Sequence, residues 1–177
     1  MIVPKQIIEL MQPFDFDSMY ELGNKKTKGV PYSVYYIDLG IVYDSIDLNG
    51  LDGALKLDLR KPIDLEPRKM VTNIGTSEHI LEQKPVFENM HNLSNYRIVH
   101  GVPRLNSWKG HGYWEYTKRF FIRLAELNNY KIEKLYFDDY WKIICCSYKK
   151  KNIQFKWSNK LYKYLKRKQG KGGVSYC

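Results

Sequence analysis

The chain has 177 residues, of which 44% are hydrophobic and 27% charged, a balance that predicts one globular domain with its own apolar core. The first ten residues lack the apolar segment of a secretory signal and no run approaches about 18 apolar residues, so we expect a cytoplasmic protein without a transmembrane segment. All 19 acids lie in residues 1–139, whereas residues 140–177 contain 11 Lys and Arg, so the net charge of +10 belongs to the C-terminal tail.

Acidic residues end three strands predicted in the first sixty residues. The pattern predicts helices over 4–11 and 31–39 and strands over 18–23, 41–50 and 54–59. These strands deliver Glu21, Asp47 and Asp58 near their carboxyl ends, and Gly23 ends the first of them. Because parallel strands bring their carboxyl ends to one edge, we expect the three acids to face one ligand. Each acid could instead cap a helix or solvate a loop, and this alternative stays open.

The stretch MVTNIGTSEH over residues 70–79 is the expected floor of an active site. An apolar run of strand length breaks at Gly75 and passes into polar residues, as a buried parallel strand does where it opens onto a ligand crevice. This places Glu78 and His79 at the end of a central strand. Glu78 could also be a helix N-terminal acid, with Thr76 or Ser77 as the cap.

The next segment predicts the rest of the sheet and a loop over its edge. We expect helices over 80–93 and 113–127, strands over 96–103, 131–137 and 141–148, and a loop over 104–112. The loop carries Trp108 and His111 and is a candidate substrate lid. His100 lies where a strand meets the crevice, although a lone histidine in a strand is more often a core residue.

The tail predicts a basic amphipathic helix. Trp157, Leu161, Tyr164 and Leu165 fall on one helix face, and lysines surround them. Such a helix can dock on its own domain or bind nucleic acid or an anionic surface through Lys149–Lys171, and both possibilities stay open.

The cysteines and histidines predict neither disulfides nor a metal. Cys145 and Cys146 are adjacent in an apolar run, and Cys177 is the last residue. The four histidines, His79, His91, His100 and His111, show no zinc-binding spacing, so we expect no metal site.

Five stretches together resemble class I S-adenosylmethionine-dependent methyltransferases. They are YELG, YDSIDLNGLDGALKLDLRKPI, VTNIGTSEHI, IVHGVP and GHGYWEY, and the likeness covers roughly residues 15–148. The resemblance implies an α/β fold, a Rossmann-like seven-stranded sheet that is mostly parallel, with an antiparallel last strand and helices on both faces. The expected domain spans 1–148, and the basic tail spans 149–177.

The resemblance also implies a cofactor, S-adenosylmethionine, and the residues that hold it. Glu21 and Gly23 look like the first-strand signature beside the methionine moiety, Asp47 like the acid that holds the ribose hydroxyls, and Asp58 like the acid near the adenine amine. Asn73 and Gly75 look like the fourth-strand motif that faces the sulfonium. The implied cofactor-binding set is Glu21, Gly23, Asp47, Leu48, Asp58, Leu59, Asn73 and Gly75. The chain departs from the family's glycine-rich turn, because Gly23 is followed by Asn24-Lys25-Lys26-Thr27.

The implied activity is methyl transfer to a hydroxyl or amine of a small molecule or glycan. Such an acceptor needs a general base, for which His79, then His111 and then His100 are the candidates, with Glu78 orienting His79. His100, Trp108 and Tyr113 are the expected acceptor contacts. The alternative is a methyltransferase-like module with weak turnover that binds nucleic acid or another polyanion through its tail. The fourth strand is followed by no NPPY-type motif of base-amine methylation.

Overall fold

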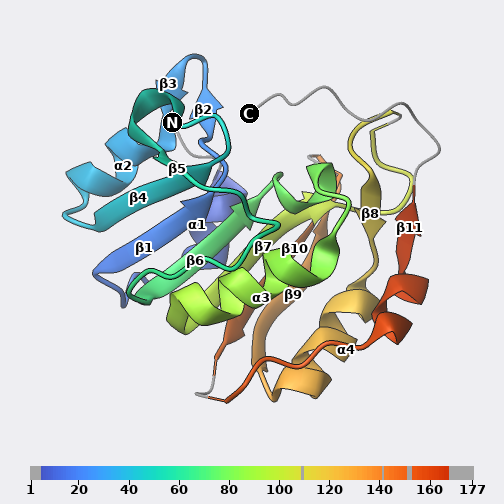
Figure 1. The fold of residues 1–177 in the computed structure, drawn as a ribbon. Coiled ribbons are helices and arrows are strands. Elements are labelled where there is room, and N and C mark those ends of the chain that lie inside the picture. Colours follow the sequence, from blue (N-terminus) through green and yellow to red (C-terminus); the bar gives the residue numbers. More distant parts are fainter. Residues whose placement is uncertain (1–4, 109, 141, 151–152, 168–177) are drawn as a thin grey trace.

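A seven-stranded sheet organises the part of the chain that the structure describes (Figure 1). The protein is represented by a computed structural model, which describes residues 5–108, 110–140, 142–150 and 153–167. In sheet order the strands are β5 (Leu55–Lys56), β4 (Val42–Asp47), β1 (Ser18–Leu22), β6 (Arg68–Ile74), β7 (Ser94–Pro103), β10 (Ile143–Lys149) and β9 (Lys131–Asp138). The first five strands in this order pair in parallel, and β10 runs antiparallel to both of its neighbours. The predicted mixed sheet with an antiparallel last strand is confirmed.

Helices cover both faces of this sheet and enclose two apolar clusters. Helices α3 (Gln83–Leu93) and α4 (Lys118–Asn128) cross the near face in Figure 1, and α1 (Lys5–Met11) lies behind it. Helix α2 (Tyr32–Asp38) shares the cluster of α1, whereas α3 and α4 share the other. Side chains alternate between the two clusters along a strand. In β1, Met19 joins the α1 side, and Tyr20 and Leu22 join the α3 side.

Two connections differ from the sequence prediction at the edge where the strands end. The connection after β1 contains a small hairpin, β2 (Lys26–Thr27) and β3 (Val30–Pro31), whose strands are too short for periodicity to reveal. Strand β5 is much shorter than the predicted 54–59. It follows a 3-10 turn, η1 (Leu51–Gly53), and the chain then turns at Asp58, which accepts a hydrogen bond from its own loop at Arg60 N.

The helix predicted from residue 113 begins later. Trp114–Tyr116 form a short strand, β8, and α4 starts after Thr117. Thr117 Oγ1 accepts a hydrogen bond from Phe120 N at 3.1 Å, the arrangement of an N-cap. The prediction missed this cap because the apolar spacing of the helix continues backward through Tyr113.

The single helix predicted for the tail is wrong. Residues 153–158 have no regular secondary structure, Asn159–Tyr164 form a 3-10 helix (η3), and Leu165–Arg167 form a strand (β11) that pairs with β8. Leu161 and Leu165 are buried in the cluster of α3 and α4. Packing on the domain therefore sets the conformation of the tail, and the helical spacing of its apolar residues does not. Of the two alternatives left open for the tail, residues 153–167 show docking on the domain, while Lys168 and Lys171 lie outside the described residues. No helix among the described residues has the length and apolarity to cross a membrane.

Candidate active site

A cavity of about 350 Å³ lies at the carboxyl ends of β1, β4 and β6. This is where open α/β sheets bind ligands, and the volume is within the usual range for small-molecule pockets. The predicted site residues that line it are Gly23, Asp47, Leu48, Asp58, Leu59, His79 and Tyr113. The prediction missed the other lining residues, although all are close in sequence to predicted ones: Ile46, Leu57, Arg60, Thr76, Ile80, Leu81 and Glu82. The structure thus brings together residues that the sequence scatters over ninety positions.

Asp47 at the end of β4 is buried, and its carboxylate is hydrogen-bonded. Oδ2 accepts from Asn24 N at 3.1 Å and Oδ1 accepts from Asn49 N at 3.0 Å. Each carboxylate oxygen has a second lone pair, so both can accept another hydrogen bond on the cavity side. Asp47 therefore fixes two loops and can still bind hydroxyl groups.

Asp58, which also lines the cavity, is hydrogen-bonded by Arg60. The guanidinium donates from Nε and Nη2 to the two carboxylate oxygens at 2.9 Å, and Arg60 N donates at 3.0 Å. These hydrogen bonds keep the pKa of Asp58 below its usual value, so its charge persists at neutral pH. Both residues line the cavity.

Gly23 brings the ends of β1 and β6 into contact. Its φ is +76°, and a Cβ there would collide with Thr76 Oγ1. Thr76 Oγ1 in turn donates to Leu22 O at 2.6 Å. Only glycine fits this position, which explains one glycine of the family-like turn in the absence of the others.

Glu21 lies apart from the cavity, on the face of the sheet that carries α1 and α2. Its Oε2 accepts from Tyr43 Oη at 2.6 Å, while Oε1 has no hydrogen-bond partner among the described residues. Burial raises the pKa of Glu21 to about 7, against the opposing effects of Tyr43 and the Lys25 ammonium. The Lys25 ammonium donates to Gly75 O at 2.7 Å, so it links the turn after β1 to the turn after β6.

Asn73 and the 3-10 helix η2 (Ser77–His79) form a buried polar network. Asn73 Oδ1 accepts from Ser77 N at 3.0 Å, and Asn73 Nδ2 donates to Ser77 Oγ at 2.8 Å. The network continues from Ser77 Oγ to Tyr116 Oη at 2.7 Å and from there to Gln83 Oε1 at 2.6 Å. Asn73 is thus a positioning residue that holds Glu78 and His79 in place. The helix-cap interpretation of Thr76 does not apply, because the Thr76 side chain accepts no hydrogen bond from η2.

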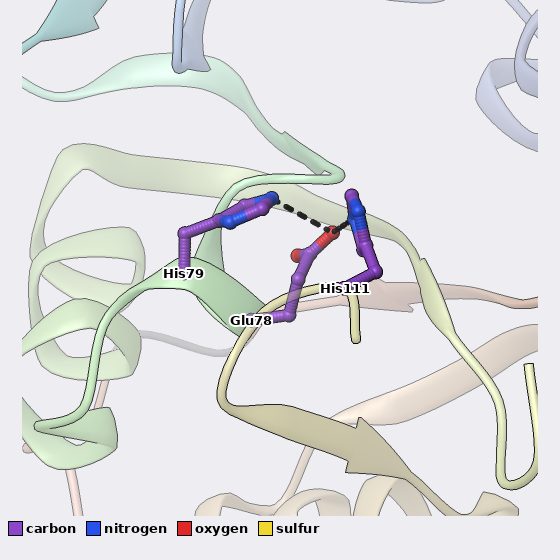
Figure 2. Close-up of side chains that lie close together, drawn as sticks. All are labelled: Glu78, His79 and His111. Atoms are coloured by element: carbon purple, nitrogen blue, oxygen red, sulfur yellow. Dashed lines mark ion pairs between the residues drawn. The ribbon is translucent and has the colours of Figure 1, made fainter. Parts of the chain in front are cut away.

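Glu78, His79 and His111 converge beside the cavity (Figure 2). Glu78 Oε1 lies 3.4 Å from His111 Nε2 and 3.8 Å from His79 Nε2. The carboxylate is fully buried, His79 lines the cavity and His111 is 36% exposed at its side chain. The two imidazole rings meet edge to face with centroids 4.6 Å apart. The expected catalytic residues therefore form one cluster.

The loop before β8 docks on Glu78 and so delivers His111. Tyr113 N donates to Glu78 O at 2.6 Å, and a Cβ on Gly112 would lie 2.8 Å from that oxygen. Trp108 meets the His111 ring edge to face at a centroid distance of 5.1 Å, without lining the cavity.

Burial lowers the pKa of His79, and the neighbouring His111 and Lys25 add to this effect while Glu78 opposes it.

His100 lies in the core and not at the cavity. It is fully buried between the rings of Phe87, Phe121 and Tyr148, and its Nδ1 lies 3.3 Å from Asn73 Nδ2. Burial lowers its pKa to about 3, so the ring is neutral. The core interpretation of this lone histidine agrees with its position.

Comparison with known proteins supports the fold. No family model and no curated protein matches the sequence. Among solved structures, the Burkholderia thailandensis 1,6-didemethyltoxoflavin-N1-methyltransferase with bound 1,6-didemethyltoxoflavin and S-adenosylhomocysteine is similar with a TM-score of 0.66 and 10% identity, over 83% of this chain and 77% of that one. A SAM-dependent methyltransferase from Aquifex aeolicus is similar with a TM-score of 0.52 and 11% identity, over 82% of this chain and 90% of that one. The class I methyltransferase fold is therefore confirmed.

Proposed function

We propose that the protein is an S-adenosylmethionine-dependent methyltransferase that acts on a hydroxyl or amine of a small molecule. The observation that carries this proposal is the cavity at the ends of β1, β4 and β6, where Gly23, Asp47 and Asp58 meet. The fold and the Burkholderia neighbour, which binds S-adenosylhomocysteine and a small acceptor, support it. A glycan acceptor fits the same site chemistry.

The residues of the cavity suit the cofactor. Asp47 offers free lone pairs for ribose hydroxyls, Asp58 an acceptor for an adenine amine, and Leu48 and Leu59 apolar surface for the base. Gly23 and Gly75 leave room beside the Lys25 ammonium, which can neutralise the methionine carboxylate in place of the missing glycines. Bound S-adenosylmethionine supplies a methyl group on an already activated sulfonium.

The chain's own residues position the acceptor and accept its proton. His79 lines the cavity and its lowered pKa keeps it neutral at physiological pH, so it can take a proton from a hydroxyl or amine. Tyr113 lines the cavity beside it, and Trp108 holds the ring of His111. Asn73 fixes the 3-10 helix that carries His79 by hydrogen bonds to Ser77, and His100 lies behind Asn73.

Calorimetric titration with S-adenosylhomocysteine tests the proposal. We expect micromolar-range affinity, and we expect Asp47→Ala to weaken binding at least tenfold, about 1.4 kcal/mol. Asp64→Ala is the matched control, because it removes an exposed carboxylate outside the cavity and should leave the affinity unchanged. Absence of heat with the folded wild-type protein would contradict the proposal.

A basic surface over α4 and η3 favours a second candidate function, the binding of nucleic acid or another polyanion. Arg123, Lys160 and Lys163 line a hollow there together with Glu126, which forms an ion pair with Arg123, and the Arg119 and Lys163 cations lie over the Tyr164 ring. Because Leu161 and Leu165 are in the core, deletion of the tail would damage the fold. Lys160→Gln combined with Lys163→Gln is the better test. It should weaken salt-sensitive binding to heparin or RNA without affecting S-adenosylhomocysteine.

A further inference from the structure

The cluster of Glu78, His79 and His111 has the donor atoms of a cation site. One donor atom from each residue lies within 4.8 Å of the other two. Two imidazole nitrogens and one carboxylate oxygen form a ligand set that divalent first-row transition metals prefer, and it leaves coordination positions open. Histidine spacing predicts no metal here, because His111 is remote from the Glu78-His79 pair along the chain.

The distances within the cluster suit ligands of one ion better than hydrogen-bonded partners. A charge-assisted hydrogen bond between imidazole and carboxylate has a length of about 2.8 Å. The observed separations of Glu78 Oε1 from the two imidazole nitrogens are 3.4 and 3.8 Å. Ligand atoms bound at about 2.1 Å in a tetrahedral shell are separated by about 3.4 Å. Figure 2 shows the carboxylate between the two rings, with both imidazoles turned toward it.

The buried carboxylate of Glu78 lacks the partners that burial requires. Its side chain is 0% exposed, and neither Oε1 nor Oε2 has a hydrogen-bond partner among the described residues. A buried carboxylate without a hydrogen bond is costly, so the two Glu78 oxygens indicate a ligand that binds beside them, where the two imidazoles converge.

The surrounding structure fixes the backbone segments that carry the three side chains. Asn73 and Ser77 fix η2 by hydrogen bonds, while Gly112 and Tyr113 press the loop of His111 onto Glu78. A metal site needs such support to set ligand positions before the ion binds. The partial exposure of His111 leaves an entry path from solvent.

We propose that Glu78, His79 and His111 bind one divalent first-row transition-metal ion of the Zn²⁺ or Co²⁺ type at the edge of the cavity. Because His79 lines the cavity, the open positions of the ion lie where an acceptor hydroxyl or amine can coordinate. This second role rests on the proposed methyltransferase function. There the imidazoles would be ligands instead of proton acceptors, and the cation would favour loss of the acceptor proton to water.

Titration of the chelator-treated, untagged protein with Co²⁺ tests the site. Binding should produce visible absorption bands that saturate at one ion per chain, and calorimetry with Zn²⁺ should agree. We expect His79→Gln and His111→Gln each to weaken Co²⁺ binding by at least about tenfold. His111→Gln is the key variant, since its side chain is partly exposed and the substitution should not disturb the fold.

Glu82→Gln is the matched control. It removes a carboxylate that lines the same cavity but does not belong to the cluster, so Co²⁺ affinity should stay within about twofold of wild type. An unchanged visible spectrum under excess Co²⁺ would overturn the proposal. Equal affinity in wild type and His111→Gln would overturn it too.

S-adenosylhomocysteine binding by the chelator-treated protein separates this proposal from the proposed function. Cofactor binding without Co²⁺ binding would remove the metal site and keep the methyltransferase. Co²⁺ binding without cofactor binding would keep the metal site and remove the methyltransferase.

Discussion

The carboxylates at the two ends of the cavity differ in the hydrogen bonds that they accept. At one end Asp47 and Asp58 are hydrogen-bonded by backbone amides and by Arg60. At the other end Glu78 is more deeply buried, and its side chain has no hydrogen bond among the described residues, only two imidazoles at 3.4 and 3.8 Å. The first end is complete as it folds, whereas the second requires a partner. A carboxylate thus supports structure at one end and indicates ligand chemistry at the other.

Gly23→Ala should produce the largest change in the free energy of unfolding, because it disrupts the turn after β1 at the end of the cavity that contains Asp47 and Asp58. An alanine at φ +76° costs about 1–2 kcal/mol, and displacement of Thr76 Oγ1 loses its hydrogen bond to Leu22 O, for a total of about 3–4 kcal/mol. Urea unfolding of the two proteins measures this loss.

The Thr76→Ala background identifies the cause of that loss. Without the Thr76 hydroxyl the collision disappears, so Gly23→Ala should cost only the backbone term of about 1–2 kcal/mol. An equal cost in both backgrounds would mean that the contact between Gly23 and Thr76 is unimportant.

Glu21 is an intermediate case, because only one of its oxygens has a hydrogen bond. Its pKa of about 7 in the folded protein exceeds the ordinary 4.5, so the folded state binds more protons between these values and stability falls as pH rises through that window. The loss is about 3 kcal/mol and is complete above pH ~7. Glu21→Gln should therefore be more stable than wild type at pH 8 and similar at pH 5.

The difference between variant and wild type is the informative quantity. Two other buried groups change the stability with pH. The pKa values of His91 and His100 are lowered, so these residues stabilise the protein as pH rises, but they contribute equally to both proteins. Urea unfolding at several pH values gives the difference. A value that does not change between pH 5 and pH 8 would rule out a titrating Glu21.

Local sequence pattern predicted most of the sheet because buried parallel strands are near-continuous apolar runs. Residues 96–103 are an example, and β7 lies over them. The pattern failed where contacts across the domain decide the structure. Residues 157–165 have a helical spacing of apolar residues, yet Leu161 and Leu165 reach the core from a 3-10 helix and a strand.

The residues at both ends of the site were predicted, but the contact at one end was not. Asp47 and Asp58 are readable from sequence because each lies at or just past the end of a strand, and the sheet then brings such ends together. The meeting of His111 with Glu78 depends on Gly112 and on the hydrogen bond from Tyr113 N, which join distant segments. No local signal carries that contact.

Asp47→Ala tests the complete end of the cavity. The substitution leaves the backbone amides of Asn24 and Asn49 without their acceptor, so the free energy of unfolding should fall by about 2 kcal/mol. Thermal unfolding without cofactor measures the loss. Asp64→Ala should change it little, and an Asp47→Ala protein as stable as wild type would show that water replaces the carboxylate without cost.

Glu78→Gln should have the smallest effect, and it should stabilise the metal-free protein. The variant keeps the shape of the side chain but removes a buried charge without a hydrogen bond, so the metal-free protein should gain about 1 kcal/mol. Excess Co²⁺ should reverse the order, because only wild type gains stability from binding the ion. Thermal unfolding with and without Co²⁺ measures both differences. A destabilised metal-free variant would mean that Glu78 is already satisfied, and the contrast between the two ends of the cavity would then be lost.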